Sequence, residues 1–151
     1  TVNNVEPGKS QMQNTGIAEF SGVEASAEYA IHRTLQYGCN YTFIERKNSS
    51  NSELKFTDVP NHKVFSYLQY SPMKGSYLVG SVEYNSKRYS TSYGTSTAGF
   101  MLLNAKGSVK VLKYFAVEGG VNNILDKNYS LSEGYPEQGR NYFVTLAYRS
   151  F

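Results

Sequence analysis

Apolar and polar residues alternate along almost the whole chain, and no long stretch keeps a helical period. The clearest run places Val23, Ala25, Ala27, Tyr29 and Ile31 on one face of a strand, with polar or small residues between them. A period of two is typical of β-strands, whose successive side chains point to opposite faces. The alternation predicts seven strands, at residues 14–31, 34–46, 62–71, 76–89, 98–105, 109–121 and 141–151.

The predicted connections alternate in length. Short ones fall at residues 32–33, 72–75 and 106–108, and long polar ones at 47–61, 90–97 and 123–140. Soluble meanders have no reason to sort loops by side, whereas outer-membrane barrels have short periplasmic turns and long extracellular loops. Most strands also reach the roughly 9–11 residues that cross a bilayer at a tilt. The pattern predicts an all-β fold, an antiparallel meander of seven long strands within a transmembrane barrel.

The last predicted strand ends the chain on an aromatic residue. Tyr142, Val144, Leu146 and Tyr148 share one face of it, and Phe151 is the final residue. In a membrane barrel these four side chains would face lipid, with tyrosines at both interfaces. A soluble edge strand that packs the same four residues on a core is the alternative for this strand.

Composition by itself leaves a soluble fold open. The chain has 14 Tyr, 8 Phe and no Trp, with a mean hydropathy of −0.48. Its longest apolar run, residues 100–103, is far shorter than the roughly 18 residues that a membrane helix needs. A soluble β-sandwich or a small soluble barrel has a similar composition.

Charge and cysteine content exclude two further classes. The net charge is +3, and the densest basic cluster is Lys87-Arg88, so no nucleic-acid-binding stripe is present in the sequence. The single cysteine, Cys39, rules out an intrachain disulfide and is interpreted as a packing residue. Residues 1–11 lack the basic and apolar segments of a signal peptide, so any such leader is expected outside this sequence.

Several motifs resemble TonB-dependent outer-membrane receptors. Residues 119–129 resemble the V-x-N-L-x-D-x-x-Y segment of that family, and residues 134–142 resemble its G-Y-P-x-x-G-R-x-Y closing loop and strand. Residues 14–24 are similar to an N-x-G…G-x-E strand, 40–43 to an N-Y-T-Y strand end, and 59–63 to a V-P-x-H-K strand start. The five matches occur in family order.

The resemblance implies a barrel of about 22 strands closed by an N-terminal plug. Such receptors take up scarce nutrients, usually ferric siderophores, across the bacterial outer membrane with energy passed on by TonB. Residues 1–151 match only the C-terminal third of that barrel, so we expect the signal peptide, plug and TonB-contacting segment to be absent here. Single-chain bacterial barrels have an even number of strands, so we do not expect seven strands to close into a barrel alone. We therefore expect a piece of a larger protein, or a remnant that pairs with another.

The resemblance also implies partners: outer-membrane lipid, the rest of the barrel and its plug, TonB through the absent N-terminal region, and the barrel-assembly machinery. That machinery would read the terminal aromatic residue, Phe151. Phe151 is out of phase with Tyr148 by one residue, which departs from the family pattern. A terminal β-bulge would restore the phase.

Catalytic chemistry has little support in the sequence. His32 and His62 lack partners at the spacing of a zinc site or a nucleophilic triad. Asp126 is interpreted as a loop-capping residue. The sequence therefore predicts that the protein is not an enzyme and has no cofactor.

Ligand contacts are expected in the long loops. Tyr93, Tyr129 and Tyr135 are candidates to stack on a siderophore, although loop tyrosines also occupy interfacial girdles. A second polar set would line the barrel lumen as a solvated face: Glu24, Glu28, Gln36, Asn40 and Arg149. The competing functions are a small self-standing or oligomeric barrel with a structural or pore role, and a soluble β-rich binding module.

Overall fold

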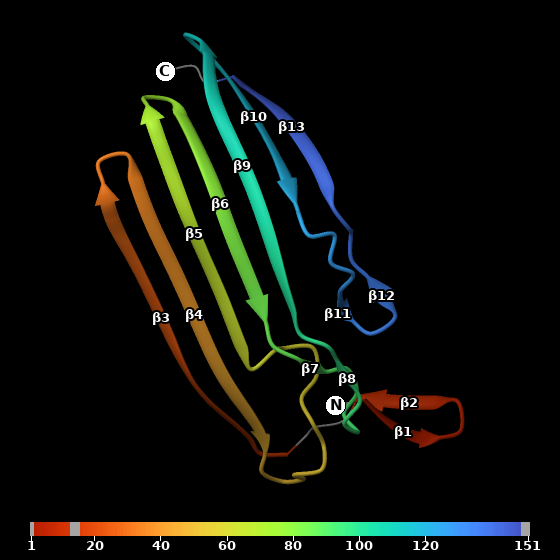
Figure 1. Ribbon diagram of the computed structural model, residues 1–151. Coiled ribbons are helices and arrows are strands. Elements are labelled where there is room, and N and C mark those ends of the chain that lie inside the picture. Colours follow the sequence, from red (N-terminus) through yellow and green to blue (C-terminus); the bar gives the residue numbers. More distant parts are fainter. Residues whose placement is uncertain (1, 13–15, 149–151) are drawn as a thin grey trace.

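The computed structural model describes residues 2–12 and 16–148, and it is dominated by one antiparallel sheet (Figure 1). Each strand of this sheet pairs with the next along the chain, in the order β13-β10-β9-β6-β5-β4-β3. The all-β meander of seven strands is therefore confirmed. The seven strands are β3 (Ala18–His32), β4 (Leu35–Asn48), β5 (His62–Met73), β6 (Ser76–Asn85), β9 (Phe100–Leu112), β10 (Phe115–Asn122) and β13 (Asn141–Tyr148).

The two ends of the sheet differ in their connections (Figure 1). Two-residue turns join the strands at one end, at Arg33-Thr34, Lys74-Gly75 and Lys113-Tyr114. Long segments join them at the other end, here called the loop end. Those segments contain two small hairpins, made by β7 (Arg88–Tyr89) with β8 (Ser96–Thr97) and by β11 (Ser130–Ser132) with β12 (Tyr135–Pro136).

A further hairpin lies at the N-terminus, near the loop end (Figure 1). It consists of β1 (Val2–Glu6) and β2 (Lys9–Met12), which pair with each other and with no strand of the large sheet. The strand alternation did not predict this hairpin. Its turn contains Pro7 and Gly8, the latter at a φ of 77°.

The predicted turn at residues 106–108 is wrong. β9 continues through Gly107 to Leu112, and Gly107 lies opposite both Leu78 and Gly119. Lys106 and Gly107 have turn-forming character, but the alternation resumes at Val109 and Val111 in the same phase. The connection falls instead at Lys113-Tyr114, and the following strand starts at Phe115 rather than at residue 109.

Strand register gathers the apolar positions on one face. Residues opposite each other in antiparallel strands share a face, so the pairs Val23↔Phe43, Tyr41↔Val64 and Tyr84↔Met101 extend a single apolar surface across the sheet. Toward the loop end, the same face of β3 and β4 continues into Glu19, Ser21, Glu45 and Lys47. Apart from His62, Ser66 and the glycines, the other members are apolar or aromatic. They are Val23, Ala25, Ala27, Tyr29, Ile31, Tyr37, Cys39, Tyr41, Phe43, His62, Val64, Ser66, Leu68, Tyr70, Leu78, Gly80, Val82, Tyr84, Met101, Leu103, Ala105, Gly107, Val109, Val111, Phe115, Val117, Gly119, Val121, Tyr142, Val144, Leu146 and Tyr148.

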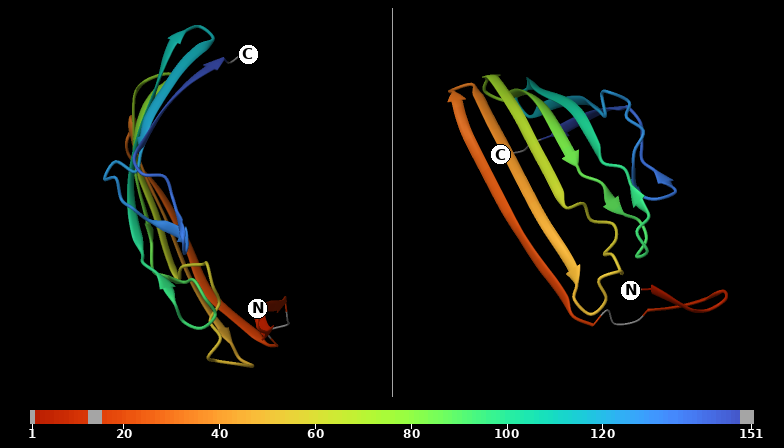
Figure 2. Two further views of the ribbon diagram at one scale, coloured as in Figure 1. Left: turned by 90° about the vertical axis from the view of Figure 1, so that its right-hand side faces the viewer. Right: turned by 60° about the horizontal axis from the view of Figure 1, so that its bottom comes forward.

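The opposite face holds most of the charges of the strands and is the concave one. The sheet curves strongly when seen edge-on, and the loops after β4 and β6 bend toward its inner side (Figure 2). Phe56, from the loop after β4, meets the ring of Phe20 at a centroid distance of 5.5 Å, which places the loop on this face. The charged residues of the concave face include Glu24, Glu28, Arg46, Lys63, Glu83, Lys106, Lys110 and Glu118.

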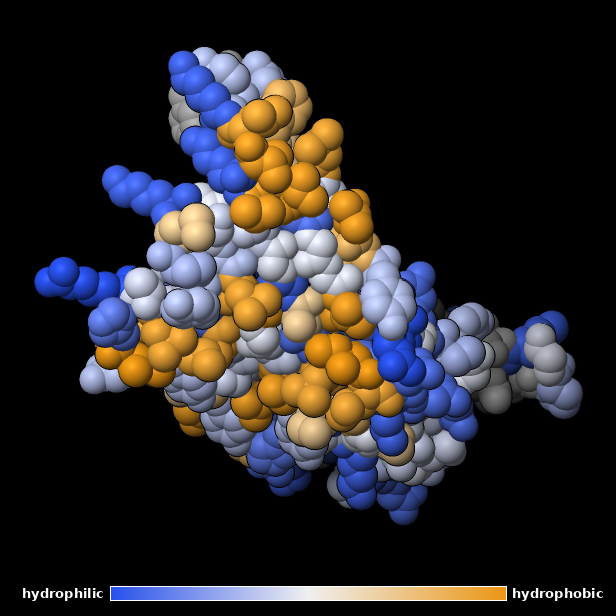
Figure 3. Space-filling model, turned by 45° about the horizontal axis from the view of Figure 1, so that its top comes forward, coloured by the Kyte–Doolittle hydropathy of each residue, from blue (hydrophilic) through white to orange (hydrophobic). Residues whose placement is uncertain are grey.

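Among the described residues, only two apolar side chains are fully buried, Phe100 at 4% and Leu102 at 7% exposure. Many large apolar residues of the convex face stand exposed instead, up to 81% for Val144. Space-filling spheres show apolar side chains gathered over the strands, with hydrophilic ones at the margins (Figure 3). A contiguous exposed apolar surface of this kind requires a covering, either lipid or another protein layer.

Candidate ligand-binding surface

Three strands of the concave face are joined by one polar network. Tyr67 Oη donates to Glu28 Oε1 at 2.9 Å, and Gln36 Nε2 donates to Glu28 Oε2 at 3.4 Å. Tyr67 must cross β4 to reach Glu28, and it does so over Gly38. A Cβ at Gly38 would lie 2.2 Å from Tyr67 Cε1, so only glycine leaves room for the ring. The predicted placement of Glu28 and Gln36 on the polar face, with Glu24 and Asn40, agrees with the register.

The same arrangement recurs near β13. The ring of Phe143 lies over Gly120, where a Cβ would be 2.6 Å from Phe143 Cε1 and 2.7 Å from the carbonyl oxygen of Ala105. Tyr77 on β6 also reaches across β9 to donate to the Glu118 carboxylate. Between these strands is an open hollow of about 410 Å³, whose lining includes Phe65, Tyr67, Val79, Ser81, Asn104, Lys106, Asn122 and Phe143.

Arg46, near the end of β4, holds the following loop onto the concave face. Its guanidinium donates to the carbonyl oxygens of Thr57 at 3.1 Å, Phe56 at 3.4 Å and Val59 at 2.6 Å. The same group lies 5.9 Å from the centroid of the Phe56 ring. A single side chain therefore holds three backbone carbonyls of the segment 56–59.

The three long loops are bonded to one another. Lys55 N donates to Ser92 O, and Asp58 N donates to Tyr89 O, both at 2.9 Å. Ser90 Oγ donates to the Glu133 carboxylate. The loop end thus forms a connected surface above the concave face.

The loop after β10 is shaped by two polar residues at positive φ. Asn123, 2% exposed, donates to Lys127 O at 2.9 Å and accepts from Lys127 N at 2.8 Å. Asp126 Oδ1 accepts from Arg140 N at 2.8 Å, and Asp126 Oδ2 lies 3.6 Å from Arg140 Nη2. The prediction that Asp126 caps a loop is confirmed, because its carboxylate joins the two ends of this segment.

Arg88 is the most unusual charged residue of the loop end. It is 5% exposed, and its guanidinium carbon lies 5.3 Å from the centroid of the Phe100 ring. Its Nε and Nη2 have no hydrogen-bond partner among the described residues. Burial lowers the pKa of Arg88, whereas the carboxylates of Asp58 and Glu83 raise it.

Tyr129 also belongs to this cluster. Its ring packs on Phe100 at a centroid distance of 4.4 Å. Burial raises the pKa of Tyr129, and the nearby carboxylates of Glu137 and Glu83 raise it further. Phe100 therefore contacts both a buried cation and a neutral phenol. Sequence reasoning considered Arg88 only as part of a basic pair and did not predict this role.

The predicted ligand-contacting tyrosines occupy different settings. Tyr93 and Tyr135 are 71% and 75% exposed in the loops, whereas Tyr129 packs on Phe100. No ring contact joins any two of the three within the described residues. The structure therefore leaves Tyr93 and Tyr135 accessible and does not bring the three together.

The closing strand has the predicted arrangement of faces. Tyr142, Val144, Leu146 and Tyr148 all lie exposed on the convex side of β13. Arg149 and Phe151 lie outside the described residues.

The described residues contain no group of three or more His, Cys, Asp or Glu side chains arranged to hold a metal ion. His62 Nδ1 instead pairs with Tyr41 Oη at 2.9 Å, and His32 Nδ1 with Thr34 Oγ1 at 3.1 Å. Nor do these residues include a helix long and apolar enough to span a membrane.

A single-layer sheet with a largely apolar convex face, a polar concave face and loops bonded across one end defines part of the wall of a large β-barrel. The family model described as "TonB dependent receptor-like, beta-barrel" matches residues 1–124. The chain therefore belongs to the TonB-dependent receptor family.

Solved structures of low sequence identity share the fold. The ferric enterobactin receptor PfeA of Pseudomonas aeruginosa matches with a TM-score of 0.79 at 18% identity, over 92% of this chain and 24% of that one. The ferric-catecholate import receptor Fiu of E. coli K12 matches with a TM-score of 0.75 at 20% identity, over 97% and 23%. The copper transporter OprC matches with a TM-score of 0.75 at 19% identity, over 87% and 23%. The chain thus spans about a quarter of the length of these receptors.

Proposed function

We propose that this chain is the C-terminal part of the barrel of an outer-membrane transporter energised by TonB. The observation that carries the proposal is the division between the two faces of one sheet. The convex face is apolar over most of the seven strands, with charges only where β3 and β4 approach the loop end (Glu19, Glu45 and Lys47), and faces lipid. The concave face bears eight charged residues and faces the lumen. A soluble binding module would need a second layer over the apolar face.

The orientation follows from the two ends. Outer-membrane barrels turn tightly on the periplasmic side and carry long loops outside. The two-residue turns therefore lie in the periplasm, and the bonded loops around Arg46 and Arg88 lie at the cell surface. On this arrangement Tyr142 and Tyr148 of β13 lie near the two membrane interfaces, and Val144 and Leu146 face the hydrocarbon.

The proposed cargo is a ferric siderophore. Two of the structural relatives are named as ferric enterobactin and ferric-catecholate receptors, while a third is named as a copper transporter. The accessible rings of Tyr93 and Tyr135 suit stacking on a flat aromatic chelate. The remaining barrel strands, the plug and the TonB-contacting segment complete the transporter, and the barrel-assembly machinery reads Phe151.

The test uses the full-length protein that contains this chain, produced in a Gram-negative strain lacking its own catecholate receptors. We expect uptake of ⁵⁵Fe-labelled ferric catecholate that disappears when TonB is deleted, and we expect Tyr93→Ala with Tyr135→Ala to raise the KM for uptake. The comparison cargo is radiolabelled copper. Uptake of copper but not of the ferric chelate would overturn the cargo, and absence of the protein from the outer-membrane fraction would overturn the transporter.

A further inference from the structure

An open hollow of about 600 Å³ lies at the loop end of the sheet. Tyr84 and Met101, an opposed pair on the convex face, form part of its lining. Leu125, from the loop after β10, adds a further apolar side chain. These three residues extend the convex apolar surface to its margin.

Two lysines, Lys87 and Lys127, stand at the rim of the same hollow. Neither ammonium group makes a hydrogen bond or an ion pair within the part of the chain that the structure describes. Lys87 comes from the segment after β6 and Lys127 from the loop after β10, so two separate loops supply the charges. The hollow therefore combines an apolar wall with two unpaired cations.

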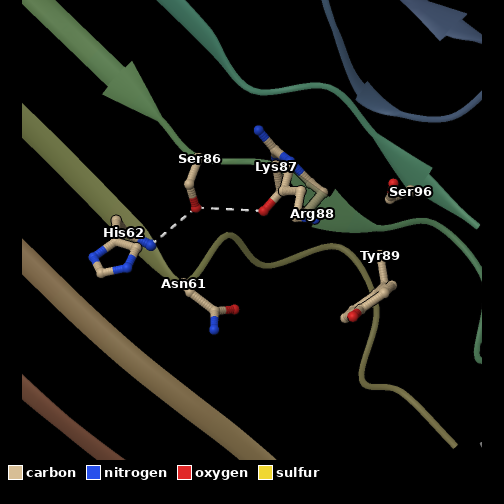
Figure 4. Close-up of a pocket in the computed structure, with 7 residues that line it drawn as sticks. All are labelled: Asn61, His62, Ser86, Lys87, Arg88, Tyr89 and Ser96. Carbon is tan, nitrogen blue, oxygen red and sulfur yellow. Dashed lines mark hydrogen bonds between the residues drawn. The ribbon is translucent and has the colours of Figure 1, made fainter. Parts of the chain in front are cut away.

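The backbone around Lys87 is held in place. Ser86 Oγ accepts from His62 N at 3.1 Å and donates to the Lys87 carbonyl at 3.3 Å, in the neighbouring pocket drawn in Figure 4. Gly99 passes so close to this segment that a Cβ there would lie 2.9 Å from Lys87 N. Lys87 thus projects from a backbone that is fixed on two sides.

The backbone at Lys127 is fixed as well. Both its N–H and its carbonyl bond to the side chain of buried Asn123. Because both backbones are fixed, the two side chains extend from set positions beside the hollow.

We propose that this hollow binds a phosphorylated lipid headgroup of the outer leaflet. The inference rests on the proposed function, because it requires the convex face to lie in the membrane with the loops outside. An acyl chain would lie against Tyr84, Met101 and Leu125, while the phosphate meets Lys87 and Lys127 at the level where headgroups sit. Lysine binds phosphate as a point charge, and basic pockets at membrane margins recognise anionic headgroups.

The test measures lipid binding to the full-length protein in detergent by native mass spectrometry. The probes are diphosphorylated lipid A and the same lipid with both phosphates removed. We expect Lys87→Gln with Lys127→Gln to weaken binding of the phosphorylated lipid at least tenfold, since each lysine at an anionic surface is worth about fivefold. Binding of the dephosphorylated lipid is expected to stay unchanged.

The matched control is Lys74→Gln with Lys113→Gln, which removes the same charge from two turns at the periplasmic end. A conservative pair, Lys87→Arg with Lys127→Arg, should retain binding and shows that the barrel still folds. Equal weakening by the loop-end and turn-end pairs would overturn the proposal, as would equal affinity of the wild-type protein for the two lipids. Ferric-chelate uptake in the same cells separates the two proposals: loss of lipid selectivity with intact uptake sinks only the headgroup site.

Discussion

The convex and concave faces of the sheet are built by the same seven strands, one residue apart, yet their side chains are arranged differently. On the convex face, large apolar side chains such as Val144 and Tyr142 stand exposed. On the concave face, Tyr67 and Phe143 lie flat across glycines of the adjacent strand, and carboxylates accept from tyrosines. On the proposed function, the convex face meets fluid lipid and the concave face meets fixed protein neighbours.

The sharpest test places a charge on either face at adjacent positions of β13. Val144→Arg is expected to destabilise the full-length barrel by about 2–4 kcal/mol, because it drives a cation into hydrocarbon. Thr145→Arg, one residue further on the concave face, should cost less than 1 kcal/mol. Denaturant-dependent folding into lipid vesicles measures both, and equal costs would mean that the convex face does not meet lipid.

A second comparison sets a glycine of the concave face, Gly120, against one of the convex face, Gly80. Gly120→Ala is expected to cost about 1–3 kcal/mol, because the new methyl group would overlap the Phe143 ring and a carbonyl oxygen of β9. Gly80→Ala on the convex face meets no atom within 4 Å and should be neutral or slightly stabilising. The same folding assay measures both, and a neutral Gly120→Ala would contradict close packing on the concave face.

Arg46 and Lys47, neighbours near the end of β4 that point to opposite faces, provide a third comparison. Arg46→Met removes three bonds to loop carbonyls and should loosen residues 49–61 by about 1–2 kcal/mol. Limited proteolysis of the folded barrel should then cut this loop about tenfold faster. Lys47→Gln, which points to the other face, is the control, and unchanged cleavage in Arg46→Met would show that the loop is held by other contacts.

The smallest effect concerns Tyr129 and pH. Its pKa is raised by burial and by nearby carboxylates, so in alkali the unfolded chain ionises this phenol before the folded loop does. The contribution of the protonated Tyr129 to the free energy of unfolding is therefore complete below the ordinary tyrosine pKa of about 10. It is lost as the pH rises through the raised pKa of the folded state. The difference between the phenolate absorbance titrations of wild type and Tyr129→Phe isolates this phenol, and a difference midpoint at the ordinary tyrosine pKa of about 10 would contradict the raised pKa.

The strands and their faces could be predicted because alternation is a local property. Val23 through Ile31 and Tyr142 through Tyr148 each show it without knowledge of any partner. The absence of a turn at Lys106-Gly107 could not be predicted this way. A Lys-Gly pair is compatible with a turn and equally with a continuous strand in which the glycine lies opposite a glycine of the next strand. Only the pairing of Gly107 with Gly119 decides between them.

The candidate site was less accessible to sequence reasoning. Asp126 was predicted as a cap because Asp favours such positions, and its bond to Arg140 N bears this out. Arg46 and Arg88 were missed, because a polar residue at a strand end has the same pattern whether it is solvated or buried. Pro7-Gly8 was an available turn signal for the N-terminal hairpin.

The directions in which the two outer strands run limit how the sheet can be completed. Seven antiparallel strands leave β3 and β13, the two outer strands, running the same way, from the loop end to the turn end. An odd number of further strands is therefore needed to join them by antiparallel pairs throughout. Copies of this sheet set edge to edge with all loops on one side would instead meet along a parallel seam, which is the weaker ladder. The odd number of strands in this sheet therefore disfavours a barrel made only of its own copies. It favours closure by a further sheet with an odd number of strands.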